Sequence, residues 1–247
     1  MAEIGIIIQA RMGSSRLPGK VAKIIEEKTV LEHVIERAKK VENCGKVILA
    51  TTDKKEDDVL ENIAKKINVA VFRGSEEDVL DRYYQAAKLF HIDPIVRITA
   101  DCPLLDAKIA ERVINFYLKN NYDYVSNVNP PTFPDGMDVE VFKFKAMEKI
   151  WKEAKLKLER DGVNDYILKN FQNFKIGNLT NNGEDVSQIR LTLDEREDMI
   201  LIKKIYKELY NKNNFFGLTE VLELFKKEPD LIKINQYIKR NEGSYKN

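Results

Sequence analysis

The first loop of the chain brings three cations close together. Arg11, Arg16 and Lys20 lie within ten residues of one another, and Gly13 stands between the two arginines. A nucleoside triphosphate carries about four negative charges, and several charge-assisted hydrogen bonds can offset the cost of removing it from water. A glycine lets the backbone approach a phosphate, and neighbouring N–H groups can then donate to it. These residues predict a phosphate-binding loop; a solvated basic loop is the alternative.

Two familiar phosphate motifs are absent from this loop. A P-loop has four residues between its glycines and then a Lys-Ser/Thr pair. Here five residues separate Gly13 from Gly19, and Val21 follows Lys20, so the hydroxyl that holds magnesium is missing. The Gly-x-Gly-x-x-Gly fingerprint of dinucleotide-binding proteins is missing as well. The loop must therefore bind its anion by another arrangement.

Two aspartates follow strand-like segments and are candidates to hold a metal ion. Asp101 follows Pro94–Ala100, and Asp194 follows Ile189–Leu193. A magnesium ion that bridges triphosphate oxygens is usually held by one or two carboxylates and by water. We expect Asp101 to be the first ligand and Asp194 the second. The alternatives are structural: Asp101 would cap the following turn, and Asp194, with Glu197 three residues on, is also typical of a helix-capping box.

These residues need elements that bring them to one edge of a sheet. Short apolar runs alternate with segments of helical periodicity over the first 120 residues. The expected strands are Ile4–Ala10, Lys46–Thr51, Val69–Phe72 and Pro94–Ala100, and the expected helices are Thr29–Val41, Glu56–Ile67, Glu77–Phe90 and Ala107–Leu118. Four successive β–α units predict an α/β protein with a mostly parallel sheet and helices on both faces. Ligands of such sheets bind beyond the carboxyl ends of the strands, so residues 11–20, 51–53 and 100–103 should share one crevice.

The pattern changes after residue 120. Tyr122–Asn127 and Met137–Phe142 are strand-like and flank a proline-rich loop, which predicts a small antiparallel excursion over about 122–142. Further helices are expected over Lys145–Leu158, over Glu195–Tyr210 and in the tail at about 218–240, and Ile189–Leu193 is expected to be one more core strand. No repeat, low-complexity tract or long linker interrupts the chain, so residues 1–247 are expected to form a single domain.

Composition narrows the class of protein. Charged residues make up 33% of the chain, yet the formal net charge is only +1. A balanced chain lacks the basic face that nucleic-acid-binding proteins usually show, so no nucleic-acid partner is expected. No apolar stretch approaches the roughly 20 residues of a membrane helix, and the first residues lack the features of a signal peptide. We therefore expect a cytoplasmic protein with no membrane partner, in which Cys44 and Cys102 are free thiols.

Taken together, the motifs resemble those of the cytidylyltransferases that make CMP-linked sugars, and most of all those of the spore-coat polysaccharide branch. The similarity runs from about Ile6 to Lys204. The matching motifs are Ile8–Lys20 (IQARMGSSRLPGK), Asp78–Tyr83, Ile98–Leu104, Phe133–Glu140 and Leu193–Asp194. Related enzymes activate 3-deoxy-manno-octulosonate and acylneuraminate sugars. The resemblance implies the three-layer α/β/α nucleotide-diphospho-sugar transferase fold. It also implies transfer of CMP from CTP to a sugar, expected to be a 2-keto sugar acid, with release of pyrophosphate, in surface polysaccharide biosynthesis.

The resemblance also implies roles for the matched residues. Arg11, Arg16, Lys20 and Asp101 would be the catalytic residues. The nucleotide site would comprise these four with Ala10, Gly13, Ser14, Thr52 and Arg82, and the sugar pocket would be lined by Asn127, Asp135, Gly136, Glu140 and Arg160. Mg2+ would be the cofactor, held by Asp101 and Asp194, and a homodimer is expected because relatives are commonly dimers. Without the resemblance, Pro134-Asp135-Gly136 is typical of a plain turn between two strands.

One stretch departs from the family's pattern. The branch usually carries an Arg-Glu-His-Val-Thr motif after the long helix, whereas this chain has Arg160-Asp161-Gly162-Val163-Asn164. The change bears on the acceptor and on the dimer contact, and it leaves the nucleotide motifs intact. Three alternatives stay open: a glycosyltransferase of the same fold, a nucleotidyltransferase that uses another base, and a non-catalytic binding subunit of a sugar pathway. His33 and His91 lie in helix patterns, and neither is expected in catalysis.

Overall fold

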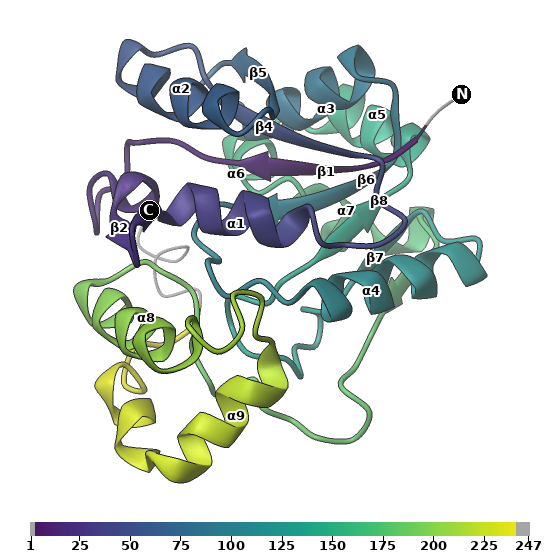
Figure 1. Ribbon diagram of the computed structural model, residues 1–247. Coiled ribbons are helices and arrows are strands. Elements are labelled where there is room, and N and C mark those ends of the chain that lie inside the picture. Colours follow the sequence, from purple (N-terminus) through teal and green to yellow (C-terminus); the bar gives the residue numbers. More distant parts are fainter. Residues whose placement is uncertain (1–2, 241–247) are drawn as a thin grey trace.

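The computed structural model describes residues 3–240, and Figure 1 shows how their elements are arranged. A seven-stranded sheet has the order β5-β4-β1-β6-β8-β7-β9. Its strands are β1 (Glu3–Gln9), β4 (Lys46–Thr52), β5 (Ala70–Gly74), β6 (Ile92–Thr99), β7 (Tyr124–Ser126), β8 (Glu140–Phe142) and β9 (Ile176–Asn178). The neighbours pair in parallel, except that β8 runs antiparallel to both β6 and β7. The predicted sheet, mostly parallel with a small antiparallel excursion, is confirmed.

Helices cover both faces of this sheet (Figure 1). One face is covered by α1 (Val30–Ala38), α2 (Asp58–Lys66) and α4 (Ala107–Lys119), and the other by α3 (Val79–Leu89), α5 (Phe144–Glu153) and α7 (Asp165–Lys169), with α6 (Lys157–Asp161) against α3. The C-terminal helices α8 (Arg196–Leu209) and α9 (Leu218–Lys227) lie at the lower end of the view and are followed by a 3-10 segment, η4 (Pro229–Ile234). The three-layer α/β/α arrangement is therefore also as predicted.

The central strand shows why the apolar runs predicted the sheet so well. Ile6 and Ile8 of β1 pack into the layer of α1 and α4, whereas Ile7 packs into the layer of α3. All three side chains are fully buried. A parallel strand with helices on both sides has no solvent face, so its sequence is continuously apolar rather than alternating.

A third apolar cluster joins the C-terminal helices to the sheet, and it corrects one prediction. Leu191 and Leu193 are fully buried against α8 and α9, among residues such as Ile202 and Phe225. The segment Ile189–Leu193 is nevertheless not a strand, because it forms only one isolated bridge, between Arg190 and Asp135. Its apolar residues are buried by helix packing instead of by a strand ladder, and a sequence pattern cannot distinguish the two.

Two other elements differ from the sequence prediction. The helix expected over Lys145–Leu158 ends at Glu153, and a short helix, α6, follows after a bend. The bend brings Arg160 back to the backbone carbonyl of Trp151, a tertiary contact that periodicity does not encode. The C-terminal tail is helical only to Lys227 before it continues as η4.

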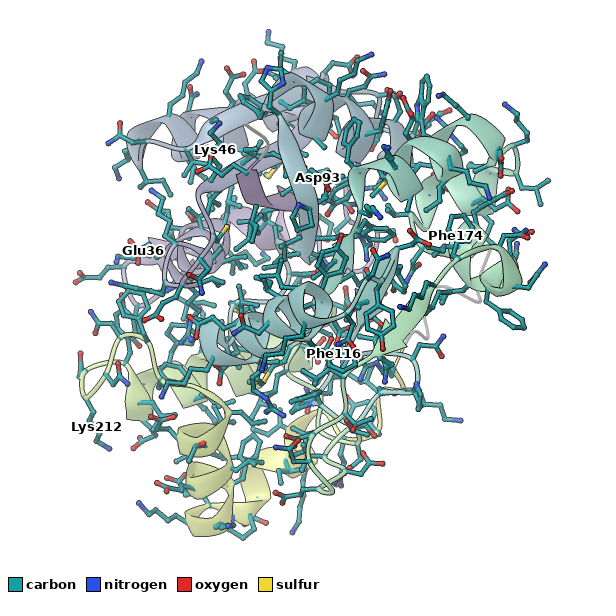
Figure 2. All side chains as sticks on the ribbon, turned by 90° about the vertical axis from the view of Figure 1, so that its right-hand side faces the viewer. Glu36, Lys46, Asp93, Phe116, Phe174 and Lys212 are labelled. Carbon is teal, nitrogen blue, oxygen red and sulfur yellow. The ribbon has the colours of Figure 1, made fainter. Side chains whose placement is uncertain are left out.

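Charged side chains surround this core. Figure 2 shows nitrogen and oxygen tips around the outline of the molecule, as at Lys212. Cys44 and Cys102 are free thiols, as expected. Within residues 3–240, none of the helices combines the length and the apolar character needed to span a bilayer.

Candidate active site

Lys20 joins the two aspartates that were predicted to hold a metal ion. Its Nζ donates to Oδ2 of Asp101 at 2.7 Å and to Oδ1 of Asp194 at 2.7 Å. Lys20 is 81 residues from Asp101 and 174 from Asp194 in the sequence, so the tertiary fold assembles the group. Because both oxygens bond to one nitrogen, they cannot be farther apart than twice that distance.

Backbone contacts hold the two aspartates in place. Asp101 follows β6, where the Thr99 hydroxyl donates to its Oδ1 at 2.6 Å. The N–H of Leu193 donates to the carbonyl of Asp101 at 2.8 Å, which ties the loop after β6 to the segment that carries Asp194. The hydroxyl of Tyr206 in α8 donates to the Pro103 carbonyl at 2.6 Å and fixes the same loop from the other side.

The lysine and the aspartates stabilise one another's charges. Burial opposes ionisation of Asp101, but the Lys20 ammonium and the hydrogen bond from Thr99 outweigh it and lower the pKa of Asp101 to about 2. Burial also disfavours the charge on Lys20, yet Asp101 and Asp194 raise the pKa of its ammonium. At neutral pH the site therefore holds a charged ammonium against an ionised carboxylate.

Asp194 is free of the capping role that the sequence allowed. Helix α8 begins at Arg196, and the carboxylate of Asp198 accepts the backbone N–H groups of both Asp194 and Glu195 at 2.8 Å. The capping acid is thus Asp198, not Asp194. The side chain of Asp194 accepts instead from three cations: Lys20 at 2.7 Å, Arg16 at 2.9 Å and Arg190 at 3.0 Å.

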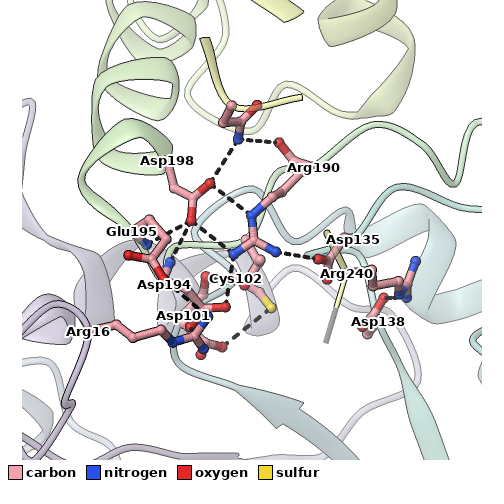
Figure 3. A network of polar contacts seen from close by, with 12 residues as sticks. Arg16, Asp101, Cys102, Asp135, Asp138, Arg190, Asp194, Glu195, Asp198 and Arg240 are labelled. Carbon is pink, nitrogen blue, oxygen red and sulfur yellow. Dashed lines mark hydrogen bonds and ion pairs between the residues drawn. The ribbon is translucent and has the colours of Figure 1, made fainter. Parts of the chain in front are cut away.

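Arg190 is a site residue that sequence reasoning missed. Its guanidinium pairs with Asp135 at 2.8 Å, with Asp194 at 3.0 Å and with Asp198 at 2.9 Å (Figure 3). The side chain is almost fully buried, so these three carboxylates satisfy a charge that would otherwise be costly to bury. An arginine inside a predicted strand carried no signal, because Asp135 is 55 residues away and a strand would not place Asp194 and Asp198 beside Arg190.

The two aspartates fit a magnesium site. Mg2+ prefers carboxylate oxygens and completes its octahedron with water and phosphate oxygens. The Lys20 ammonium lies between Asp101 and Asp194, so a metal ion there would require Lys20 to turn away. Within the part of the chain that the structure describes, no group of three or more His, Cys, Asp or Glu side chains is arranged to hold a metal. An ion on this pair would therefore depend on substrate oxygens for its remaining ligands.

The loop after β1 presents its cations beside this centre. Gly19 has a φ of +65°, and its N–H donates to the Met12 carbonyl at 3.1 Å, which closes the loop. The Met12 N–H is anchored to Asp57 at 2.6 Å. Arg16 extends toward Asp194, whereas Arg11 lies 3.5 Å from Glu76. Both arginine side chains are partly exposed, Arg11 at 45% and Arg16 at 36%, so they remain accessible to an anion.

The nucleotide half of the predicted site lies over the ends of β1 and β4 and the start of α3. Asp78 caps α3 through the N–H of Asp81, which fixes Arg82 in the first turn. Arg82 is fully buried and donates through NH1 to the Ser75 carbonyl at 2.8 Å. Its Nε and NH2 have no partner among residues 3–240, and burial lowers the pKa of its guanidinium. Buried donors without acceptors are costly, which is an arrangement expected where a ligand supplies the acceptors.

Other residues assigned to the nucleotide surround the same end of the sheet. Ala10 and Thr52 are buried at the ends of β1 and β4, and Thr52 donates its hydroxyl to Asp57. The neighbouring Thr51 hydroxyl and the Gln9 side-chain oxygen are buried and find no partner in the described part of the chain.

The residues assigned to the sugar pocket fall into two groups. Asp135 pairs with Arg190, and Gly136 follows it with a φ of +99°. A Cβ at Gly136 would lie 2.4 Å from the backbone nitrogen of Thr192, so glycine is required there. Asn127 is fully buried and braces the excursion, because its amide donates to the Met137 carbonyl and accepts from the Val139 N–H, each at 2.9 Å.

The second group consists of Glu140 in β8 and Arg160 in α6. The Glu140 carboxylate accepts from Arg97, from the Tyr124 hydroxyl and, at 2.7 Å, from the amide of Asn164. Asn164 belongs to the stretch that departs from the family motif, so that departure contacts a residue assigned to the pocket. Arg160 pairs with Asp78 at 3.0 Å. Its donors thus have partners within the protein, and its role toward a substrate stays a prediction.

Comparison with known proteins gives a consistent result. The family model described as cytidylyltransferase matches residues 5–231. An uncharacterized protein of Methanocaldococcus jannaschii is 40% identical over 95% of both chains. The spore coat polysaccharide biosynthesis protein SpsF of Bacillus subtilis is 30% identical over 93% of this chain and 97% of its own length. A 3-deoxy-manno-octulosonate cytidylyltransferase of Hydrogenovibrio crunogenus is 36% identical over 48% of each chain.

A solved structure supports the same assignment. A cytidylyltransferase from Leptospira borgpetersenii superposes with a TM-score of 0.89 and 38% sequence identity, covering 94% of this chain and 97% of the other. The similarity therefore includes the overall fold and nearly the whole length of both chains.

Proposed function

Because this chain belongs to the cytidylyltransferase family, we propose that it transfers CMP from CTP to a sugar hydroxyl with release of pyrophosphate. It is a CTP-dependent nucleotidyltransferase, and the proposal concerns its acceptor and its site. The observation that carries the proposal is the contact of Lys20, at the end of the loop after β1, with Asp101 and Asp194. A triphosphate loop beside two carboxylates supports nucleotidyl transfer, which depends on positioning and charge neutralisation more than on a protein nucleophile.

The acceptor we propose is a 2-keto sugar acid that attacks through its anomeric hydroxyl. The similarity to a 3-deoxy-manno-octulosonate cytidylyltransferase supports this class of acceptor. The similarity to a spore coat polysaccharide biosynthesis protein supports a role in making a surface polysaccharide.

Six charged residues of the site would take part in this reaction. Asp101 and Asp194 would hold Mg2+, which when bound neutralises phosphate charge and favours ionisation of the attacking hydroxyl. Lys20 would turn from the two carboxylates to the triphosphate, and Arg16 would stabilise the charge that develops on the departing pyrophosphate. Arg82 would offer its two free donors to the nucleotide, and Arg11 would leave Glu76 for a phosphate.

The cellular setting completes the proposal. We place the enzyme in the cytoplasm, where CTP is available, and we expect a homodimer. The mass of the purified protein in solution, measured by light scattering, tests the second point: a mass near 28.6 kDa would count against a dimer.

Thermal stabilisation by CTP, UTP, ATP and GTP, each with and without magnesium, is the first test of the proposal. A ligand that binds only the folded state raises the melting temperature by an amount that grows with its concentration and affinity. Stabilisation by CTP with magnesium, and not by the other nucleotides, is the expected result, and pyrophosphate release with candidate sugars then follows. Preference for another nucleotide would contradict the use of CTP. Stabilisation by CTP without pyrophosphate release from any sugar would favour a binding subunit.

A further inference from the structure

Most cations of the candidate site are fully engaged by carboxylates. Lys20 binds two of them, and Arg190 binds three. Arg97 is buried against Glu140. The proposed reaction commits Arg16 and Lys20 to the triphosphate, so none of these residues is available to neutralise an acidic acceptor.

Arg240 approaches the same site from the C-terminal segment. Its NH2 donates to Oδ1 of Asp138 at 2.6 Å, and its NH1 donates to the Phe133 carbonyl at 3.3 Å. Figure 3 shows this pair next to Asp135, at one side of the network that extends through Arg190 to Asp194. The guanidinium thus lies on the excursion loop that carries the residues assigned to the sugar.

The Arg240–Asp138 pair is half-buried and reaches the surface on both sides. The side chain of Arg240 is 18% exposed and that of Asp138 is 36% exposed. Because both side chains reach the surface, a substrate carboxylate can take the place of Asp138 and keep the Arg240 guanidinium paired. Arg190 differs in this respect, because its side chain is only 4% exposed.

The acceptor side of the site contains three acids, each already paired with an arginine. Asp135, Asp138 and Glu140 lie within six residues of one another. Burial and the two neighbouring acids raise the pKa of Asp138 to about 7, and Arg240 opposes that shift. A carboxylate that enters this region needs a cation, because like charges at close range repel.

We propose that Arg240 binds the carboxylate of the sugar-acid acceptor and thereby determines the preference for an acidic over a neutral sugar. The inference rests on the proposed function. Arg240 lies beyond residues 5–231, which match the family model, so membership of the family does not supply this residue.

The test compares Arg240→Gln, Asp138→Asn and Lys239→Gln with the wild type. Lys239 is the adjacent exposed cation and serves as the matched control. Pyrophosphate release from CTP and magnesium would be measured with 3-deoxy-manno-octulosonate, with N-acetylneuraminate and with the uncharged carboxamide of each. Stabilisation of every variant by CTP and magnesium would be measured in parallel.

For Arg240→Gln, the KM of the sugar acids should rise about tenfold or more, as expected for the loss of a hydrogen bond between charged groups. The KM of the carboxamides and the stabilisation by CTP should not change. Asp138→Asn should lower the KM of the sugar acids, because it removes the internal competitor. Lys239→Gln should behave as the wild type, and Arg240→Lys should restore part of the affinity.

Two kinds of result would overturn the inference while the proposed function stands. One is an equal change, or no change, of KM for the acids and their carboxamides in Arg240→Gln. The other is a wild type that binds CTP and releases pyrophosphate with neutral sugars but with neither acid, which leaves the transfer of CMP to a sugar intact. A wild type that CTP does not stabilise, or that uses neither kind of sugar, would instead reject the proposed function, and this inference with it.

Discussion

At the scale of single residues, the Lys20 ammonium stands where a magnesium ion would have to bind. It neutralises two carboxylates that would otherwise repel each other, and it lies in the loop that would hold the triphosphate. The same side chain therefore has two alternative partners, the aspartates without substrate and the phosphates with it. Binding of CTP and of metal should consequently favour each other, since each requires Lys20 to leave the aspartates.

Replacing Asp101 with Asn tests its part in the reaction. The amide cannot supply a second anionic ligand, so kcat should fall by about 100-fold or more, while the free energy of unfolding drops by only about 1–2 kcal/mol. Pyrophosphate release and urea denaturation measure the two effects. Asp230→Asn, at an exposed position that contacts none of the site residues, is the control. Near-normal turnover in Asp101→Asn would refute the metal assignment.

Replacing Lys20 with Met tests the metal site without relying on activity. The two carboxylates lose their ammonium, so the variant should be less stable than the wild type in EDTA. Because the competing cation is gone, magnesium alone should raise its melting temperature, whereas it should barely affect the wild type. Scanning calorimetry with and without magnesium shows the difference. Equal responses of both proteins to magnesium would argue against a shared place for Lys20 and the ion.

The acid stability of the protein should report the Lys20–Asp101 pair. The pKa of Asp101 is lowered from 3.8 to about 2, so its contribution to stability is fully present above pH 4 and is lost as the pH falls toward 2. The difference in unfolding free energy between wild type and Asp101→Asn should be constant from about pH 5 to 8 and shrink below about pH 4. Urea titrations at each pH measure it. A difference that persists at pH 2 would contradict the shifted pKa.

Sequence reasoning reached some of these residues and missed others for physical reasons. The first loop was recognisable because its glycines and cations are close in the chain. Asp194 was ambiguous, since it stands one residue before the N-cap residue Glu195, and only the structure shows that Asp198 accepts the first backbone N–H groups. Arg190 could not be found, because its three acidic partners converge only in the folded chain.

At the scale of elements, the excursion between β7 and β8 carries most of the residues assigned to the acceptor. Its path depends on a close approach between Gly136 and the segment before α8. The strands that frame it were predicted because Val125 and Val141 are part of the buried core, even though each strand is only three residues long.

Gly136→Ala should therefore be strongly destabilising. The backbone strain at a φ of +99° costs about 1–3 kcal/mol. The clash with Thr192 should add at least about 1 kcal/mol. Gly183→Ala is the matched control, because Gly183 has a φ of +92° and nothing within 4 Å of its Cβ position. Denaturant unfolding of both variants separates strain from clash. Equal losses would show that the approach to Thr192 can relax.

Elements that the sequence did not predict are short or lack the usual signals. Strand β9 is three residues long and contains a glycine, so it has no periodic pattern. The hairpin of β2 (Ile24–Ile25) and β3 (Lys28–Thr29) turns through Glu26 and Glu27, both with positive φ. Hairpin turns of this kind usually carry Asn or Gly, and two glutamates give no such indication.

At the scale of the whole molecule, Arg190 links three parts of the chain. It contacts the excursion through Asp135 and α8 through Asp198, and its carbonyl accepts from Asn235 just after η4 at 3.1 Å. The C-terminal helices are thus connected to the site through one buried guanidinium.

Arg190→Met should affect stability and the site together. Loss of the cation leaves Asp198 fully buried without its charge partner, which costs about 3–5 kcal/mol. Arg196→Met, at an exposed position on α8, the helix that carries Asp198, should cost less than about 0.5 kcal/mol. Thermal and urea unfolding would compare the two. Similar stabilities of both variants would mean that Arg190 is not the link described.

The antiparallel insertion of β8 also bears on how the polypeptide is made. The strands β5, β4, β1 and β6 are all complete by Thr99. Strand β8, which pairs with the other edge of β6, begins only at Glu140. At about 5–20 residues per second, a ribosome needs roughly 2–8 s to add that intervening stretch. During this interval the nascent β6, with its apolar Ile95 and Val96, has an unpaired edge that other chains can join. Slow translation between residues 100 and 140 would therefore favour aggregation, and chaperone binding to this edge would be most useful in that period.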